Sequence, residues 1–360
     1  MTDRMLRQFL EMVQIDSESG NEARFMSYLL AEIAEVGGTA ALDDYGNLIA
    51  TFDAVGCEGV EPILLSCHGD TVKPGVGIEP VLEEGVIRSK GDTILGADDK
   101  AGIAEVLEAL RVAPVRPPIE LAVSRQEEVG LLGVKEMDFS LLTARRGFLM
   151  DNDTLDTIII GGPTYFAIDV AVGGHSAHAG MEPEKGINAI VAAAKGISAL
   201  RLGRIDHETT ANVGVISGGI IRNGVPDACS FLAECRSADH NKAVALSEEM
   251  TSILEREIEA TGATVEIQVE EMCRAVEIPK EAWTVQIAKR ALASVGIDAS
   301  AVFMTGFTDA SIYNNCGIEM AVIGIGAQNE HSTEECIEVA EMEKAVKMLV
   351  EIFRLVAKTD

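Results

Sequence analysis

Apolar and polar residues follow two different patterns along this chain. In the first 160 residues, short and nearly continuous apolar runs at 63–66, 119–124 and 147–150 are separated by segments of helical periodicity. Strands that are apolar on both faces are typical of a parallel sheet covered by helices. This part of the chain is therefore predicted to be an α/β unit with a mostly parallel sheet.

The pattern changes near residue 164, where apolar and polar residues begin to alternate as in a half-exposed strand. A helix is expected from Pro183 to about Leu200, and a second from about 242 to 260. With strands at 211–217, 227–234 and 264–269, the order is βαββαβ, which is ferredoxin-like. After about residue 275 the α/β pattern returns. We therefore predict a discontinuous domain, 1–163 and 275–360, with an inserted α+β domain at 164–274.

Composition narrows the function classes. Lys and Arg number 29 and Asp and Glu 58, and the net charge of −29 argues against nucleic acid or an anionic membrane as partner. No apolar run approaches the roughly 18 residues of a membrane span. The N-terminal residues resemble an amphipathic helix rather than a signal peptide, so a cytoplasmic protein is expected. Seven cysteines without a CxxC spacing suggest free thiols, and Cys67 is expected to pack in the core.

Ionisable side chains follow the predicted strands, where ligands bind in open α/β sheets. Each has an ordinary explanation, such as a solvated His or an Asp that caps a helix. Together they would repel one another unless cations balanced them, and such N and O ligands suit Zn²⁺, Mn²⁺ or Co²⁺. The chain has no G-x-S-x-G, P-loop or H-E-x-x-H motif. The residues at the strand ends are His68, Asp70, Asp98, Asp99, Glu127, Glu128, Asp151, Asp153 and His331.

Six segments carry a resemblance to a known family: SCHGDTV, GADDKAG, EEVGLLGVKEMD, FLMDND, GGHSAHAG and NEHSTEE. They occur in this order over nearly the whole chain. On these segments the sequence resembles the M20 family of metallopeptidases, and within it the peptidase T group and its shorter relatives. The resemblance implies a catalytic domain with an inserted lid and two divalent metal ions, Zn²⁺ or alternatively Co²⁺ or Mn²⁺.

The resemblance also implies which residues bind these metals. His68 and Asp151 would bind one metal, and Glu128 and His331 would bind the other. Asp98 would bridge the two metals, and the peptide bond that follows it is expected to be cis.

Three further residues would take part in catalysis by the same resemblance. Glu127 would be the general base that activates a hydroxide bridging the two metals. Asp70 would hydrogen-bond the far ring nitrogen of His68, as metal-bound imidazoles usually require. His178, in the lid, would help to bind the oxyanion.

Three residues are candidates for binding the substrate. Asn223 and Arg236 match lid positions that grip a substrate carboxylate in some relatives, although Arg236 could equally be a structural strand residue. Gly306 lies in MTGFTDAS, a segment that resembles the Gly-rich loop near the substrate backbone. The lid is also expected to form a homodimer.

The sequence therefore predicts a hydrolase of peptide bonds in short peptides, most similar to aminopeptidases that act on tripeptides. An N-acyl amino acid deacylase or a carboxypeptidase is the alternative within the same family. A peptide-binding protein without catalytic activity is a third hypothesis. The complete set of ionisable residues at the strand ends argues against it.

Overall fold

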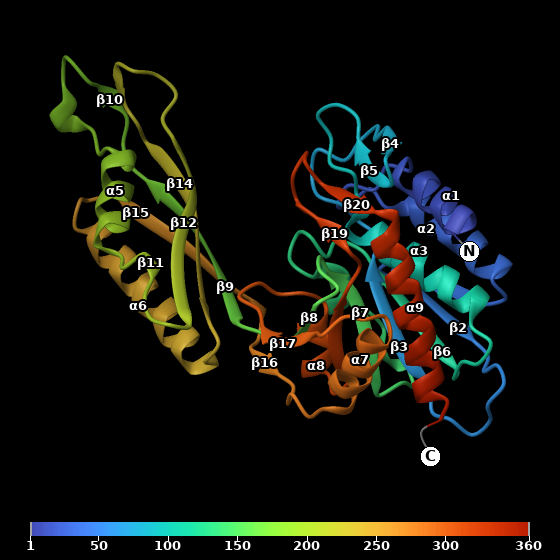
Figure 1. Cartoon of the computed structure of the whole chain (residues 1–360). Coiled ribbons are helices and arrows are strands. Elements are labelled where there is room, and N and C mark those ends of the chain that lie inside the picture. Colours follow the sequence, from blue (N-terminus) through green and yellow to red (C-terminus); the bar gives the residue numbers. More distant parts are fainter. Residues whose placement is uncertain (1, 359–360) are drawn as a thin grey trace. The chain divides into compact units, whose positions relative to one another are not determined.

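The computed structural model describes residues 2–358 and divides into two compact units (Figure 1). One unit comprises Met1–Gly161 and Glu277–Asp360, and the other comprises Gly162–Val276. The second unit is thus inserted into the first. None of the described helices is long and apolar enough to cross a membrane.

The larger unit contains a nine-stranded mixed sheet with the order β1-β2-β6-β3-β7-β18-β8-β16, in which β17 also pairs with β8. The four central strands, β6, β3, β7 and β18, are parallel, so their carboxyl ends lie at one edge of the sheet. The strands are β1 (Thr39–Leu42), β2 (Leu48–Phe52), β3 (Ile63–His68), β6 (Ile119–Ser124), β7 (Arg146–Asn152), β8 (Thr157–Gly162), β16 (Val276–Glu277), β17 (Ser300–Phe303) and β18 (Glu319–Gly324).

The two faces of this sheet meet different helices. Ile63, Leu65 and Cys67 of β3 belong to the main core with residues of α1, α3 and α9, so Cys67 packs as predicted. On the other face, the Ser66 hydroxyl lies 3.1 Å from the Tyr313 hydroxyl of α8. The helices are α1 (Thr2–Val13), α2 (Ala23–Glu35), α3 (Ala97–Val112), α4 (Leu132–Lys135), α7 (Trp283–Ser294), α8 (Ala310–Asn315) and α9 (Val339–Val356), with a 3₁₀ turn, η1 (Phe139–Leu141).

A small four-stranded sheet supports the loop that contains His331. Its order is β19-β20-β5-β4, and β19 pairs antiparallel with β20 on either side of that loop. The loop is therefore held at both ends by the same pair of strands. These strands are β4 (Pro80–Glu83), β5 (Val86–Ser89), β19 (Ala327–Gln328) and β20 (Cys336–Glu338).

The inserted unit is a five-stranded antiparallel sheet packed against two helices, which agrees with the predicted βαββαβ order and fold class. Alternate residues of its long strands enter a separate hydrophobic core. A short pair, β10 (Ala177–His178) and β13 (Gly224–Val225), extends from it. The other elements are β9 (Thr164–Gly173), α5 (Ala189–Ala199), β11 (Gly203–Arg204), β12 (Thr209–Gly218), β14 (Ala228–Ser237), α6 (His240–Glu259) and β15 (Thr264–Cys273).

The prediction that a helix begins at Pro183 was wrong. Pro183 opens only a 3₁₀ turn, η2 (Pro183–Lys185), and Gly186 is extended, with a ψ of 156°. Helix α5 begins after Asn188, whose side chain accepts a hydrogen bond of 3.0 Å from the Val191 N–H. Capping by Asn188, which the apolar pattern does not encode, places the true start.

One carboxyl group in the core of the larger unit lacks compensation. Glu105, on α3, is fully buried, and neither of its carboxyl oxygens has a hydrogen-bond partner in the part of the chain that the structure describes. Burial, and then the charge of Asp99, raise the pKa of Glu105 well above its usual value. This group therefore remains protonated in the folded chain at pH values where the unfolded chain releases the proton.

We expect Glu105→Gln to become progressively more stable than the wild type as pH rises above the ordinary Glu pKa of 4.5. In this window the unfolded wild type releases a proton that the folded state retains, so rising pH favours its unfolding. The difference in unfolding free energy should grow by roughly 1.4 kcal/mol per pH unit until the folded pKa is reached. Urea unfolding at several pH values measures it, and a difference independent of pH would contradict the prediction.

Candidate metal centre

Two imidazoles, each beside two carboxylates, lie at the carboxyl edge of the parallel strands. His68 ends β3, and Asp151 lies near the end of the neighbouring strand β7. Nε2 of His68 is 2.9 Å from Oδ1 of Asp98 and 3.4 Å from Oδ1 of Asp151. We call these three residues the first ligand group.

The second ligand group is built around the other imidazole. Nε2 of His331 is 3.2 Å from Oδ2 of Asp98 and 3.0 Å from Oε1 of Glu128. Asp98 therefore offers one carboxylate oxygen to each group, which is the arrangement that a carboxylate shared between two cations requires.

The second group fits a metal better than it fits a hydrogen-bonded cluster. Oε1 of Glu128 is buried and has no hydrogen-bond partner among the described residues, although His331 lies within 3.0 Å. A single N–H of His331 cannot point at both Asp98 and Glu128, whereas a cation between the three atoms would satisfy all of them. Imidazole and carboxylate donors without thiolates suit Zn²⁺, Mn²⁺ or Co²⁺.

The electrostatics of the second group agree with this interpretation. The nearby carboxylates of Asp98 and then Glu128 raise the pKa of His331 to about 11, so the negative charge around this ring favours a bound proton, as it would favour a cation. His331 also has a φ of 58°, in the left-handed region that residues other than Gly rarely adopt. Such backbone conformations cluster at functional sites because they must be held by their surroundings.

A buried carboxylate that the sequence analysis did not single out holds Asp98 in place. Glu335 accepts hydrogen bonds from the backbone N–H groups of Leu95 (2.8 Å), Gly96 (2.7 Å) and Asp98 (3.0 Å). It follows His331 by four residues, so one loop supplies both a member of the second ligand group and the support of Asp98. The only signal in the sequence was its place in NEHSTEE, where an adjacent Glu334 is equally acidic.

The peptide bond between Asp98 and Asp99 is cis, as expected. It lies at the start of α3, directly after the segment that Glu335 holds.

Asp70 contacts the far ring nitrogen of His68, as expected, and the closer contact is made by its backbone oxygen. Nδ1 of His68 lies 3.0 Å from the backbone oxygen of Asp70 and 3.6 Å from its carboxylate. The carboxylate instead accepts hydrogen bonds from the backbone N–H groups of Glu127 (2.9 Å) and Glu128 (3.3 Å), and from the Ser19 hydroxyl (2.7 Å). Asp70 thus orients the imidazole with its backbone and the Glu127–Glu128 segment with its side chain.

Glu127 directly precedes Glu128 of the second ligand group, and its backbone N–H donates to Asp70. It is buried, and burial followed by the charge of Asp151 raises its pKa well above the usual value. A carboxyl group with a raised pKa is suited to exchanging protons near neutral pH.

A second buried acid that sequence reasoning did not assign lies near this segment. Asp309 accepts a short hydrogen bond from the Ser124 hydroxyl, and its other oxygen has no partner among the described residues. Burial raises the pKa of Asp309 to about 7. Gly306, the predicted substrate contact, lies three residues earlier, in the bend between β17 and α8.

The predicted lid residues lie at two separate places in the inserted unit. His178 is on β10 and is exposed, and the backbone oxygen of Asn223 accepts a 3.0 Å hydrogen bond from the Ala179 N–H. His178 and Asn223 both line a cavity of about 440 Å³. Arg236 lies apart on β14, where it pairs with Glu234 at 2.8 Å and stacks 4.5 Å from the Tyr165 ring centroid.

Comparison with known proteins gives one consistent result. Residues 164–261 match the peptidase dimerisation domain of M20 peptidases. The chain is 38% identical to the uncharacterised protein YqjE of Bacillus subtilis over 99% of both chains. Among solved structures, it is similar to the aminopeptidase PepT of Bacillus cereus, with 36% identity and a TM-score of 0.88 over 99% of both chains. It is also similar to a tripeptidase of Staphylococcus aureus, with 34% identity and a TM-score of 0.93 over 100% of this chain and 99% of that one.

We expect that each ligand group can lose its metal ion independently of the other. His68→Ala should lose the ion of the first group and His331→Ala the ion of the second, whereas Asp98→Ala should weaken both because it supplies an oxygen to each. Elemental analysis after gel filtration measures the ions retained per chain. Retention of both ions by His68→Ala and His331→Ala would show that these groups do not bind metal.

We expect Glu335→Gln to weaken metal binding by about 10–100-fold, as loss of a residue that orients ligands generally does. In this variant the amide nitrogen of Gln would face one of the backbone N–H groups around Asp98. An amide nitrogen cannot accept the hydrogen bond that this N–H donates. Competition with a chelator measures the affinity. The neighbouring exposed Glu334→Gln is the matched control and should bind metal normally. Equal affinities in the two variants would contradict the role of Glu335.

Proposed function

This chain belongs to the M20 peptidase family, and we propose that it is a dinuclear-metal aminopeptidase that acts on short peptides. The observation that carries the proposal is Asp98, whose two carboxylate oxygens lie 2.9 Å from His68 and 3.2 Å from His331. A structural carboxylate needs only one such partner. One that joins two groups of imidazole and carboxylate donors is suited to holding a pair of divalent ions.

The proposed assignment of ligands follows the two groups. His68 and Asp151 would hold one ion and His331 and Glu128 the other, and Asp98 would offer one carboxylate oxygen to each. Zn²⁺ is the proposed metal because imidazole and carboxylate are its usual catalytic ligands, with Co²⁺ and Mn²⁺ as alternatives. Such ions, when bound, lower the pKa of water and polarise the carbonyl of the scissile bond.

The residues of the chain supply the remaining steps. Glu127 takes a proton from the attacking water and later donates it to the leaving amine, a task that its raised pKa favours. Asp70 holds Glu127 in position through the 2.9 Å hydrogen bond to its backbone. In the inserted unit, His178 binds the oxyanion and Asn223 contacts the substrate, and Gly306 of the larger unit is a further substrate contact.

An aminopeptidase is favoured over a carboxypeptidase or a deacylase. Two solved relatives above 30% identity carry the names aminopeptidase and tripeptidase. Arg236, the candidate grip for a terminal carboxylate, is occupied by Glu234 and Tyr165 within its own sheet. We therefore prefer a structural role for Arg236. We expect the enzyme to require a substrate with a free α-amine.

We also propose that the chain forms a homodimer through the inserted unit. The support is the match of residues 164–261 to a peptidase dimerisation domain. The cytoplasmic location expected from the sequence remains a prediction.

The substrate class is tested with blocked and unblocked peptides. With Zn²⁺, Co²⁺ or Mn²⁺ added, we expect release of the first residue from di- and tripeptides and no cleavage of the same peptides after N-acetylation. Chromatography of the products measures this. Cleavage of N-acyl amino acids alone, with unblocked peptides intact, would replace the proposal by the deacylase alternative.

Glu127→Gln should lower kcat by about 10²–10⁴-fold, because the amide cannot transfer the proton. Its metal content should equal that of the wild type, since Glu127 belongs to neither ligand group. Glu136→Gln, an exposed change on the same segment, is the control and should keep full activity. Activity of Glu127→Gln near that of the wild type would refute the mechanism.

A further inference from the structure

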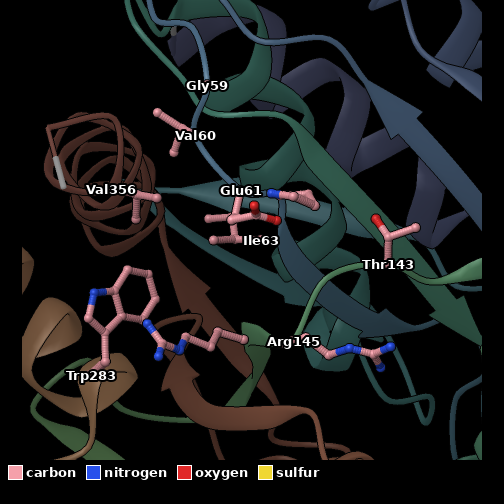
Figure 2. Close-up of a pocket in the computed structure, with 10 residues that line it drawn as sticks. Gly59, Val60, Glu61, Ile63, Thr143, Arg145, Trp283 and Val356 are labelled. Carbon is pink, nitrogen blue, oxygen red and sulfur yellow. The ribbon is translucent and has the colours of Figure 1, made fainter. Parts of the chain in front are cut away.

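A cavity of about 410 Å³ lies in the larger unit, away from the metal centre (Figure 2). Ile63 and Arg146, the first residues of β3 and β7, line it. His68 and Asp151 lie toward the other ends of the same two strands. The five residue-to-residue steps of β3 from Ile63 to His68 span about 16 Å, so the cavity is separate from the metal centre. Its volume lies within the range of small-molecule sites, about 300–1,000 Å³.

The cavity presents charges of both signs that the chain does not pair. Glu61 and Arg145 both line it and are both exposed. Within residues 2–358, neither the Glu61 carboxylate nor the Arg145 guanidinium has a hydrogen-bond or ion-pair partner. They also do not pair with each other, although they line the same cavity. A ligand with a positive and a negative end would complement both.

The rest of the lining is apolar or occupied. The half-buried ring of Trp283 forms one wall, and the guanidinium carbon of Arg146 lies 5.2 Å from its centroid. In Figure 2, Trp283 lies below Val356 on one side, Arg145 lies on the other, and Glu61 is between them. The charged groups therefore adjoin a flat apolar surface that can cover an aliphatic or aromatic side chain.

We propose that this cavity binds the zwitterion of an apolar amino acid or of a short apolar peptide. The ligand's carboxylate pairs with Arg145, whose planar guanidinium can donate two parallel hydrogen bonds. Its ammonium group pairs with Glu61, and its side chain packs on Trp283. Amino acid and peptide share these three features and differ in the distance between the charged ends. The proposal concerns a second site and does not depend on the activity of the metal centre.

The chain carries its own reporter for this site. Trp283 is the single tryptophan in the sequence, so the tryptophan emission of the protein comes from the wall of this cavity. A ligand bound only at the metal centre lies at the other edge of the sheet and should leave that emission unchanged. Fluorescence titration of the metal-loaded protein therefore separates the two sites.

The experiment compares L-leucine with two analogues on the wild-type protein. We expect a saturable change of Trp283 emission with L-leucine. N-acetyl-L-leucine lacks the ammonium and leucinol lacks the carboxylate, so each should bind at least about tenfold more weakly, which corresponds to the loss of roughly 1.4 kcal/mol. Dileucine, titrated into the Glu127→Gln variant, decides between amino acid and peptide as the tighter ligand.

Matched variants assign the two charges. Arg145→Gln and Glu61→Gln should each weaken L-leucine binding at least about tenfold. Arg88→Gln and Glu83→Gln, exposed changes in the same unit outside the cavity, should bind it normally. Circular dichroism checks that each variant is folded.

Three results would overturn the proposal. The first is the absence of a saturable change with both L-leucine and dileucine. The second is equal binding of L-leucine and both analogues, which needs no variant to fold. The third is undiminished binding in the folded Arg145→Gln and Glu61→Gln variants.

Discussion

The burial of several carboxylates at one edge of a parallel sheet is the constraint on which the larger unit depends. Asp98, Glu127 and Asp70 are nearly or fully buried, and like charges this close are unfavourable unless they are compensated. Compensation comes from the imidazoles of His68 and His331, from backbone N–H groups, and in the proposed function from two cations. Without cations, the clustered carboxylates at this edge repel one another. The same clustering makes the edge suited to a dinuclear metal centre.

Two carboxylates that bind no metal in the proposed assignment hold the ligand segments. Glu335 accepts three backbone N–H groups at the start of α3 and so fixes Asp98. Asp70 accepts the N–H groups of Glu127 and Glu128 and so fixes the proposed base and one ligand. Each connects segments far apart in the chain, because a carboxylate can bind several N–H groups that have no partner in a helix or sheet. The precision of the centre therefore rests on backbone hydrogen bonds as much as on the ligands themselves.

The two edges of the central strands differ in their chemistry. The carboxyl edge gathers imidazoles and acids, whereas the cavity at the opposite edge presents Arg145, Glu61 and an apolar wall with Trp283. Both include residues at the ends of the same two strands, β3 and β7. The cavity and the ligand groups thus lie at opposite ends of β3, which spans about 16 Å from Ile63 to His68.

The sequence by itself determined the alternation of elements, the inserted unit and the residues at the strand ends. These features depend on local periodicity and on residue type, which are readable without the fold. Only the tertiary structure decided the rest. It decided that the backbone oxygen of Asp70 faces His68, that Glu335 rather than Glu334 supports the bridge, and that Asn188 starts α5. It also brought Glu61, Arg145 and Trp283 to one cavity, because contacts between residues so distant in the chain depend on how the elements pack and not on any local pattern.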